Sequence, residues 1–252
     1  MHVRNIRCTH HAFGGQRGAA LFVVIVLVLL SMLLALWASR SALFSEMIVG
    51  NDADHQRAFE AAQALLLDAE LDIRGELSDG SACVPDGGKP ALCRHGGSVA
   101  QFPLEAREIQ PLLTALLAMA PTRCRNALCA KRTGKQDFWN NSDSSQGPTL
   151  GQMTDTRVGA RYGQFTGAAN GPESNPILAD RSSADAGGWY WIEVLPHDPN
   201  AGNAALVANG TALLALHMTP QVVYRVTALA WGRKPGTQVV LQQTYARQRL
   251  KN

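Results

Sequence analysis

The feature that most constrains this chain is an apolar run of twenty residues, Ala19–Ala38. The run contains one hydroxyl group, on Ser31, and no charged residue. Since a helix rises about 1.5 Å per residue, a run of this length matches the roughly 30 Å hydrocarbon core of a bilayer. The sequence therefore predicts a transmembrane segment at residues 19–39.

The charges on either side of the run predict its orientation. Arg4, Arg7 and Arg17 precede it without any acidic residue, and the first acidic residue of the chain is Glu46. Basic residues are retained on the cytoplasmic side of a membrane. We therefore expect a single pass through the inner membrane, with a cytoplasmic N-terminus and a periplasmic remainder.

The length of the run argues against an ordinary secretion signal. Such a signal has an apolar region of about 7–15 residues that ends in a small-x-small cleavage site. Here Leu36 and Trp37 stand two positions before Ala38 and Ser39, so no good site is present. The run alone leaves open the alternative of an uncleaved anchor that carries a periplasmic binding module.

An amphipathic pattern follows the membrane segment and predicts one long helix over residues 19–78. Gly50, with Asn51 and Asp52 after it, predicts a kink or a local melt. The apolar stripe recurs at steps of three and four: Phe59, Ala62, Leu66, Ala69 and Ile73. Charged residues are expected on the other faces of this helix: Asp54, Arg57, Asp68 and Asp72.

The N-terminal segment resembles a known family. The stretch "QRGAALFVVIVLVLLSMLLALWASRSALFSEMIVGNDADHQRAFEAAQALLLDAE" is similar to the start of PilX-like minor pilins of the type IV pilus. These share a Gln-(Arg/Gln)-Gly-x-Ala-Leu opening, a Glu-Met-x-x-Gly-Asn segment and an Ala-Phe-x-Ala-Ala segment. The later stretch "YRVTALAWGRKPGTQVVLQQTYA" is similar to the closing strand pair of the family. Residues 79–188 show no such resemblance.

The resemblance implies that residues 1–18 form a leader of the prepilin type. A prepilin peptidase would cut between Gly18 and Ala19 on the cytoplasmic side, and Ala19 would then be methylated. At the fifth position after this cut the chain has Val23, where major pilins have a glutamate that pairs with the N-terminal amine of the subunit ahead. The departure implies a subunit with no neighbour ahead, at or near the pilus tip.

Four cysteines follow the membrane segment, and an exported segment with four cysteines is expected to form two disulfides. Three connectivities are open, of which we favour the local pairs Cys83 with Cys93 and Cys124 with Cys129. A zinc site is the rival interpretation, although spacings of ten and five residues are unlike those of zinc knuckles.

The remainder, residues 79–252, predicts a globular head of α+β class with a pilin-like fold. A short helix is expected at 104–120, started or kinked by Pro111, and a long loop at 134–188 with one short strand near 157–165. Strands are expected at 188–195, 221–231 and 238–246, with a possible fourth at 211–218. We expect these strands to form an antiparallel sheet that packs against the long helix.

Few side chains in the head suggest chemistry. Motifs of hydrolases, zinc peptidases and nucleotide-binding enzymes are lacking, so neither an enzyme nor a cofactor is expected. Asp180 and Asp185 could bind calcium in principle, but only two acids are present and no metal site is expected. Trp189 and Trp191 alternate with Tyr190, and we expect both tryptophans to pack against the long helix.

The expected function is that of a minor pilin in a priming or tip complex, which initiates pilus assembly and supports adhesion or twitching motility. The resemblance implies contacts with other minor pilins and the major pilin through the N-terminal helix, and with a PilY-family tip adhesin. No nucleic-acid partner is expected, because the late basic residues lack an accompanying aromatic pattern. A tip pseudopilin of a type II secretion system is the alternative with the same helix.

Overall fold

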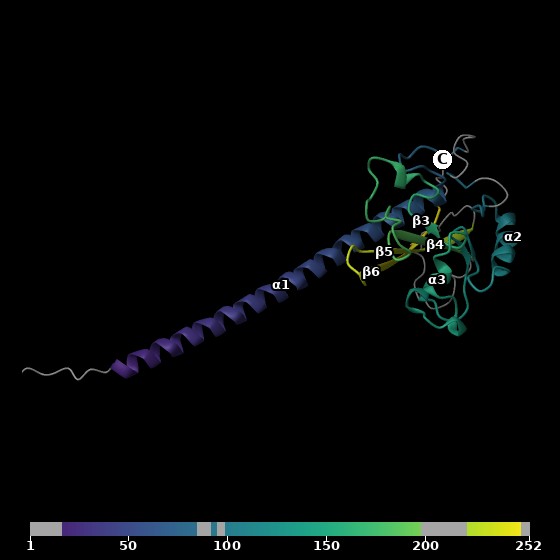
Figure 1. Ribbon diagram of the computed structural model, residues 1–252. Coiled ribbons are helices and arrows are strands. Elements are labelled where there is room, and N and C mark those ends of the chain that lie inside the picture. Colours follow the sequence, from purple (N-terminus) through teal and green to yellow (C-terminus); the bar gives the residue numbers. More distant parts are fainter. Residues whose placement is uncertain (1–16, 85–91, 95–98, 198–220, 248–252) are drawn as a thin grey trace, which may run out of the picture. The chain divides into compact units, whose positions relative to one another are not determined.

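The computed structural model describes residues 17–84, 92–94, 99–197 and 221–247 (Figure 1). The chain separates into two compact units, residues 1–51 and residues 52–252. The first unit contains the N-terminal part of helix α1, Arg17–Arg74, and the second contains the end of that helix and every other described element. We refer to the second unit as the head.

Helix α1 ends at a glycine. Gly75 has φ +72°, its N–H donates to the carbonyl of Asp72 at 3.1 Å, and the N–H of Glu76 donates to the carbonyl of Leu71 at 2.9 Å. This pair of bonds is a Schellman motif, which satisfies the last carbonyl groups of a helix. The helix therefore ends at Arg74, before the expected boundary at residue 78. The expected local melt at Gly50 is wrong, because that residue is helical.

The described residues of the head form a six-stranded sheet in the order β1-β2-β4-β5-β6, with β3 paired to β4. The strands β4, β5 and β6 confirm the three predicted at 188–195, 221–231 and 238–246, and β3 confirms the short strand expected near 157–165. The strand considered at 211–218 lies outside the described residues. The strands are β1 (Cys124–Arg125), β2 (Leu128–Ala130), β3 (Ala160–Arg161), β4 (Gly188–Pro196), β5 (Val222–Trp231) and β6 (Gln238–Tyr245).

The sheet is mixed: the three predicted strands pair antiparallel, as expected, and the parallel pairing involves β2, for which no strand was predicted. β4, β5 and β6 pair antiparallel, as do β1 with β2 and β3 with β4, but β2 runs parallel to β4. The reason is that β1 and β2 form a small hairpin, with positive φ at Asn126 and Ala127, that adds to the sheet by its second strand. Only three residue pairs join β2 to β4, so a sequence pattern could not reveal this pairing.

Short helices fill the segments around the sheet. Helix α2, Ala106–Leu117, confirms the predicted short helix, and Pro111 lies inside it. The Oε2 atom of Glu108 accepts from the N–H groups of Leu104 and Glu105 at its start. The expected loop at 134–188 contains helix α3, Leu150–Met153, and three single turns of 3-10 helix at Phe138–Asn140, Ser144–Gln146 and Ala168–Asn170.

The sheet has an apolar cluster on each face. On one face the end of α1 packs against alternate residues of β4 and β5, and Leu65 at its centre is fully buried with Tyr190 and Ile192. On the other face Trp189 and Trp191 pack with Phe138 and Met153. The expectation that both tryptophans contact the long helix is therefore wrong. The alternation of side chains along β4 turns Tyr190 toward α1 and the tryptophans away from it.

Two disulfides confirm the local pairing of cysteines. Cys83 is bonded to Cys93, with 5.6 Å between the Cα atoms, and closes the segment that follows α1. Cys124 is bonded to Cys129, which is its direct partner in the β1–β2 hairpin, with 4.0 Å between the Cα atoms. Both bridges lie in the head and therefore in the segment expected to be exported.

Candidate assembly helix

The N-terminal apolar part of α1, residues 19–49, presents its large apolar side chains outward. From Leu21 to Val49 these side chains are between 36% exposed, at Val26, and 72% exposed, at Trp37. By length and composition this is a helix that could cross a membrane. Such a surface is stable only when lipid or other helices cover it.

Two hydroxyl groups within this part of the helix bond to its own backbone. The hydroxyl of Ser31 donates to the carbonyl of Val28 at 2.8 Å, and the hydroxyl of Ser45 donates to the carbonyl of Ser41 at 2.9 Å. In lipid an unsatisfied hydroxyl costs free energy, and a bond back to the helix removes that cost. The segment from Ala19 to Ser39, before Arg40, therefore has an apolar surface without a charged side chain.

The residues predicted to direct processing and assembly lie in the first turns of α1. Gly18 and Ala19 follow the first helical residue, Arg17. Val23 lies one turn further and is 53% exposed. No carboxylate side chain occurs along the helix between Ala19 and Ser45, so this stretch offers an amine no partner of opposite charge.

The head end of α1 holds the β5–β6 turn through a buried carboxylate. Asp54 accepts the backbone N–H groups of Arg233 and Lys234, each at 3.0 Å. Burial raises the pKa of Asp54, but the two N–H donors and the Thr237 hydroxyl outweigh it, so that this pKa lies below its usual value. The Asp54 carboxylate therefore stays ionised, and it serves as the acceptor for the two N–H groups of the turn.

A second buried carboxylate, Asp72, joins three segments of the head. It forms an ion pair with Arg94 at 2.6 Å and accepts the Tyr190 hydroxyl at 2.7 Å. Burial and the charge of Asp72 raise the pKa of Tyr190 well above its usual value, so this hydroxyl remains a donor. Nη1 of Arg94 donates to the carbonyls of Ala100 and Asn126. The guanidinium also lies 4.0 Å from the centre of the Phe165 ring.

The third carboxylate, Asp68, holds the loop before the 3-10 turn at residue 168. Its Oδ2 accepts the N–H of Gly163 at 2.8 Å, and its Oδ1 accepts the hydroxyl of Thr166. Burial raises the pKa of Asp68 to about 6, although both hydrogen bonds oppose that shift. Asp68 is therefore less stably ionised than Asp54.

The sequence analysis placed these three carboxylates off the apolar stripe, and the structure shows that their face of the helix is buried as well. Asp54, Asp68 and Asp72 are at least 95% buried, whereas Arg57 is exposed as expected. Phe59 of the predicted stripe is only partly buried, and Leu65 replaces it at the centre. The available signal was spacing: positions 54, 58, 61, 65, 68 and 72 also recur at steps of three and four.

The residues considered for calcium, Asp180 and Asp185, belong to no cluster of three or more potential ligands from His, Cys, Asp and Glu in the described part of the head. Asp180 uses Oδ1 to accept the N–H of Ser182 at 2.8 Å, which closes a turn. The same turn lowers the pKa of Asp180, through the hydroxyl and N–H of Ser182.

Comparison with known families decides the class of the protein. A family model described as PilX N-terminal matches residues 17–66, and one described as type IV pilus assembly protein PilX C-term matches residues 125–247. The chain belongs to the PilX family of type IV pilus assembly proteins. No curated protein and no solved structure matches the chain significantly.

The PilX matches extend beyond the resemblance seen in the sequence. The C-terminal match covers every strand except the first residue of β1, whereas sequence reasoning found a resemblance only in the closing strand pair. Residues 67–124 lie between the two matches and hold Asp68, Asp72, Arg94 and the first disulfide. As a PilX-family protein the chain is a minor pilin, a structural component that interacts with other components of the pilus.

Proposed function

We propose that this minor pilin belongs to a priming complex at the pilus tip, where it initiates assembly and supports adhesion or twitching motility. The observation that carries the proposal is Val23. Major pilins have a glutamate at the corresponding position, which pairs with the amine of the subunit ahead. A carboxylate without that partner would cost several kcal/mol in a dry helix bundle. A subunit with nothing ahead of it is most stable with an apolar residue there.

The proposal includes processing by prepilin peptidase. The enzyme cuts between Gly18 and Ala19 on the cytoplasmic side, removes the leader and methylates Ala19. The N-terminus faces the cytoplasm and the head faces the periplasm until the subunit leaves the membrane. The exposed apolar surface of residues 19–39 supports this sequence of events, because it suits lipid first and neighbouring helices afterwards.

The same surface supports the contacts with other pilins, and the tip adhesin is proposed from the resemblance to PilX-like proteins. Other minor pilins and the major pilin contact the apolar helix, and a PilY-family tip adhesin binds the complex. Association exchanges lipid for protein contacts without a net gain of buried apolar area, so close packing must supply the favourable free energy.

The test is the position of this subunit on isolated pili. Immunogold labelling of a functional tagged chain should mark fibre ends. Val23→Glu introduces the glutamate that major pilins have at this position, and the label should then also appear along the shaft. The matched variant Val24→Glu should still be labelled at fibre ends. Even labelling of wild-type shafts would refute the tip position. Deletion of the gene should abolish twitching motility and leave exoprotein release unchanged, and the reverse result would favour a secretion pseudopilin.

A further inference from the structure

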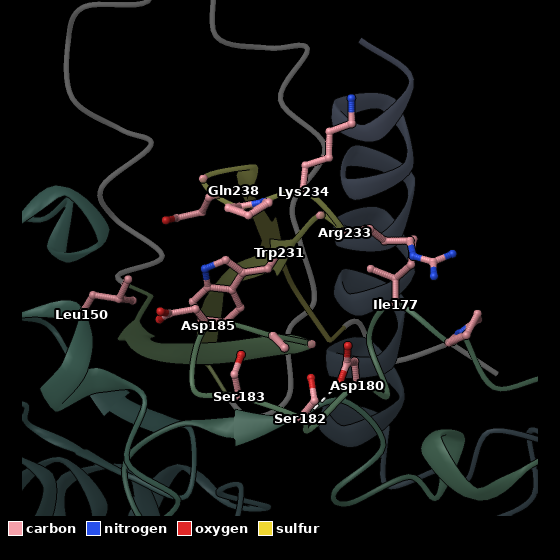
Figure 2. A pocket seen from close by; sticks show the side chains of 16 residues that line it. Leu150, Ile177, Asp180, Ser182, Ser183, Asp185, Trp231, Arg233, Lys234 and Gln238 are labelled. Atoms are coloured by element: carbon pink, nitrogen blue, oxygen red, sulfur yellow. Dashed lines mark hydrogen bonds between the residues drawn. The ribbon is translucent and has the colours of Figure 1, made fainter. Parts of the chain in front are cut away.

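A cavity of about 770 Å³ lies in the head between two loops that are far apart in the sequence. One wall is the segment 176–187 before β4, and the other is the turn 231–238 between β5 and β6 (Figure 2). Its volume is that of a small-molecule binding pocket. None of its lining residues belongs to the assembly helix.

A backbone hydrogen bond joins the two walls of the cavity. The N–H of Trp231 donates to the carbonyl of Gly187 at 3.1 Å. Gly187 has φ +81°, and a Cβ atom there would lie 2.2 Å from the carbonyl oxygen of Asp180. A glycine is therefore required for the loop to close against the strand.

Each wall is also held from behind by a charged side chain. Asp54 accepts both N–H groups of the 233–234 turn, and Gly232 permits the approach, since a Cβ atom there would lie 2.4 Å from Oδ2 of Asp54. Behind the other wall, Arg161 donates from Nη1 to the carbonyl of Ala186 at 2.7 Å. A pocket whose walls are already fixed binds its ligand at a lower entropic cost.

The charges that line the cavity cancel. Asp180 and Asp185 lie on one wall, and Arg233 and Lys234 lie on the other. Each wall would repel one kind of ion. The two carboxylates would repel an anionic ligand, and the two bases would repel a cationic ligand. The lining thus favours a ligand without net charge.

The polar groups that remain suit hydroxyl groups. Ser182 and Asp180 are bonded to each other, whereas Ser183 offers a hydroxyl, Asp185 accepts hydrogen bonds and Gln238 both donates and accepts. In Figure 2 the indole of Trp231 lies between the two sets of side chains. Trp231 is 7% exposed and belongs to the cluster of Trp189 and Trp191, so a small part of its indole remains as an apolar contact for a sugar ring whose hydroxyls contact the walls.

We propose that this cavity binds a neutral oligosaccharide, with Asp185, Ser183 and Gln238 as hydrogen-bonding groups and Trp231 as the apolar contact. A peptide fits less well, because an anchoring side chain would need a deep apolar hole, and the lining here is mixed. The proposal does not depend on the position of the subunit in the fibre.

The experiment uses the full-length protein in a polyoxyethylene detergent, since maltoside detergents carry a neutral saccharide that could occupy the site. Labelled protein is applied to one printed array that holds neutral, sialylated and amine-bearing oligosaccharides together with peptides. The strongest neutral ligand is then titrated against the wild type, two cavity variants and one control variant. Asp185→Asn and Gln238→Ala should each weaken binding about tenfold, the loss expected for one good hydrogen bond.

The matched control is Asp155→Asn. Asp155 accepts the N–H of Arg157 at 2.9 Å in a turn outside the cavity, so this variant should bind as the wild type does. Near-ultraviolet circular dichroism verifies that each variant is folded. The proposal is overturned if the array shows no neutral ligand, if sialylated, amine-bearing or peptide spots bind more strongly, or if the control loses as much affinity as the cavity variants.

Discussion

The guanidinium of Arg94 binds both carboxylate oxygens of Asp72, through Nε to Oδ1 at 2.7 Å and through Nη2 to Oδ2 at 2.6 Å. The two side chains are 6% and 2% exposed. This bidentate pair joins the last turns of α1 to the segment that begins at the first disulfide, because Arg94 follows Cys93 directly. Removing either partner would leave a charge buried and unpaired.

The first prediction concerns that ion pair. Asp72→Asn should lower the free energy of unfolding by about 3–5 kcal/mol, because it leaves the Arg94 charge without a partner. Thermal unfolding of the full-length protein in detergent measures the change. Arg107→Gln is the control: it removes a pair with Glu105 in which both side chains are largely exposed, and it should change the midpoint very little. Equal losses in the two variants would contradict the assigned role of burial.

The second prediction concerns pH. Burial raises the pKa of Asp68 to about 6 in the folded chain, from 3.8 for the free side chain. The folded state then binds more protons than the unfolded state, so this residue should lower stability as pH rises from about 4 to 6. The loss should amount to roughly 2–3 kcal/mol. The loss of stability should be complete once the pH exceeds the pKa of Asp68 in the folded chain.

Asp68→Asn isolates this contribution. The amide cannot ionise, and the Thr166 hydroxyl can reverse to accept a hydrogen bond from it. Unfolding midpoints of wild type and variant, measured at several pH values from 4 to 7.5, should differ in slope below pH 6 and run parallel above it. Parallel curves over the whole range would show that Asp68 does not titrate there.

The third prediction concerns close packing beside the tryptophans. A Cβ atom on Gly159 would lie 2.8 Å from Nε1 of Trp191 and 2.9 Å from the carbonyl oxygen of Met153, which accepts the hydrogen bond of that same indole at 2.9 Å. Gly159→Ala should therefore cost about 1–3 kcal/mol. A Cβ atom on Gly151 would have no neighbouring atom within 4 Å, so Gly151→Ala should be neutral or slightly stabilising. Chemical denaturation of both variants compares them, and a neutral Gly159→Ala would refute the contact.

The fourth prediction concerns processing. If prepilin peptidase cuts after Gly18, Gly18→Val should leave the leader attached, because a larger residue obstructs the enzyme. Gly15→Val, in the same leader, should be processed normally. Intact mass spectrometry of the membrane-extracted protein distinguishes the two species. A Gly18→Val chain that still loses residues 1–18 would place the recognition elsewhere.

Sequence reasoning predicted the elements whose patterns are local. The apolar run, the strands β4 to β6 and the α+β class depend on periodicity and turn residues within short windows. The pairing of Cys124 with Cys129 was also accessible, because five residues permit few geometries other than a hairpin.

What sequence reasoning missed depends on contacts across long separations. Asp68 looked solvent-exposed because a charged side chain is usually so, and its donors Gly163 and Thr166 lie about a hundred residues away. The parallel pairing of β2 with β4, and the side of the sheet on which Trp191 lies, likewise follow from tertiary placement. The cavity could not be predicted at all, since its two walls carry no shared motif.

The division of the chain after Asn51 has a practical consequence for anyone who wishes to express the head without its anchor. Residues 52–74 supply Ala58, Leu65 and Ala69 to one face of the sheet, together with the three buried carboxylates. A fragment begun after the helix would expose that face to water and would leave Arg94 and the 233–234 turn without their partner. A soluble fragment should therefore begin near Asp52, and one begun at residue 79 should aggregate during expression.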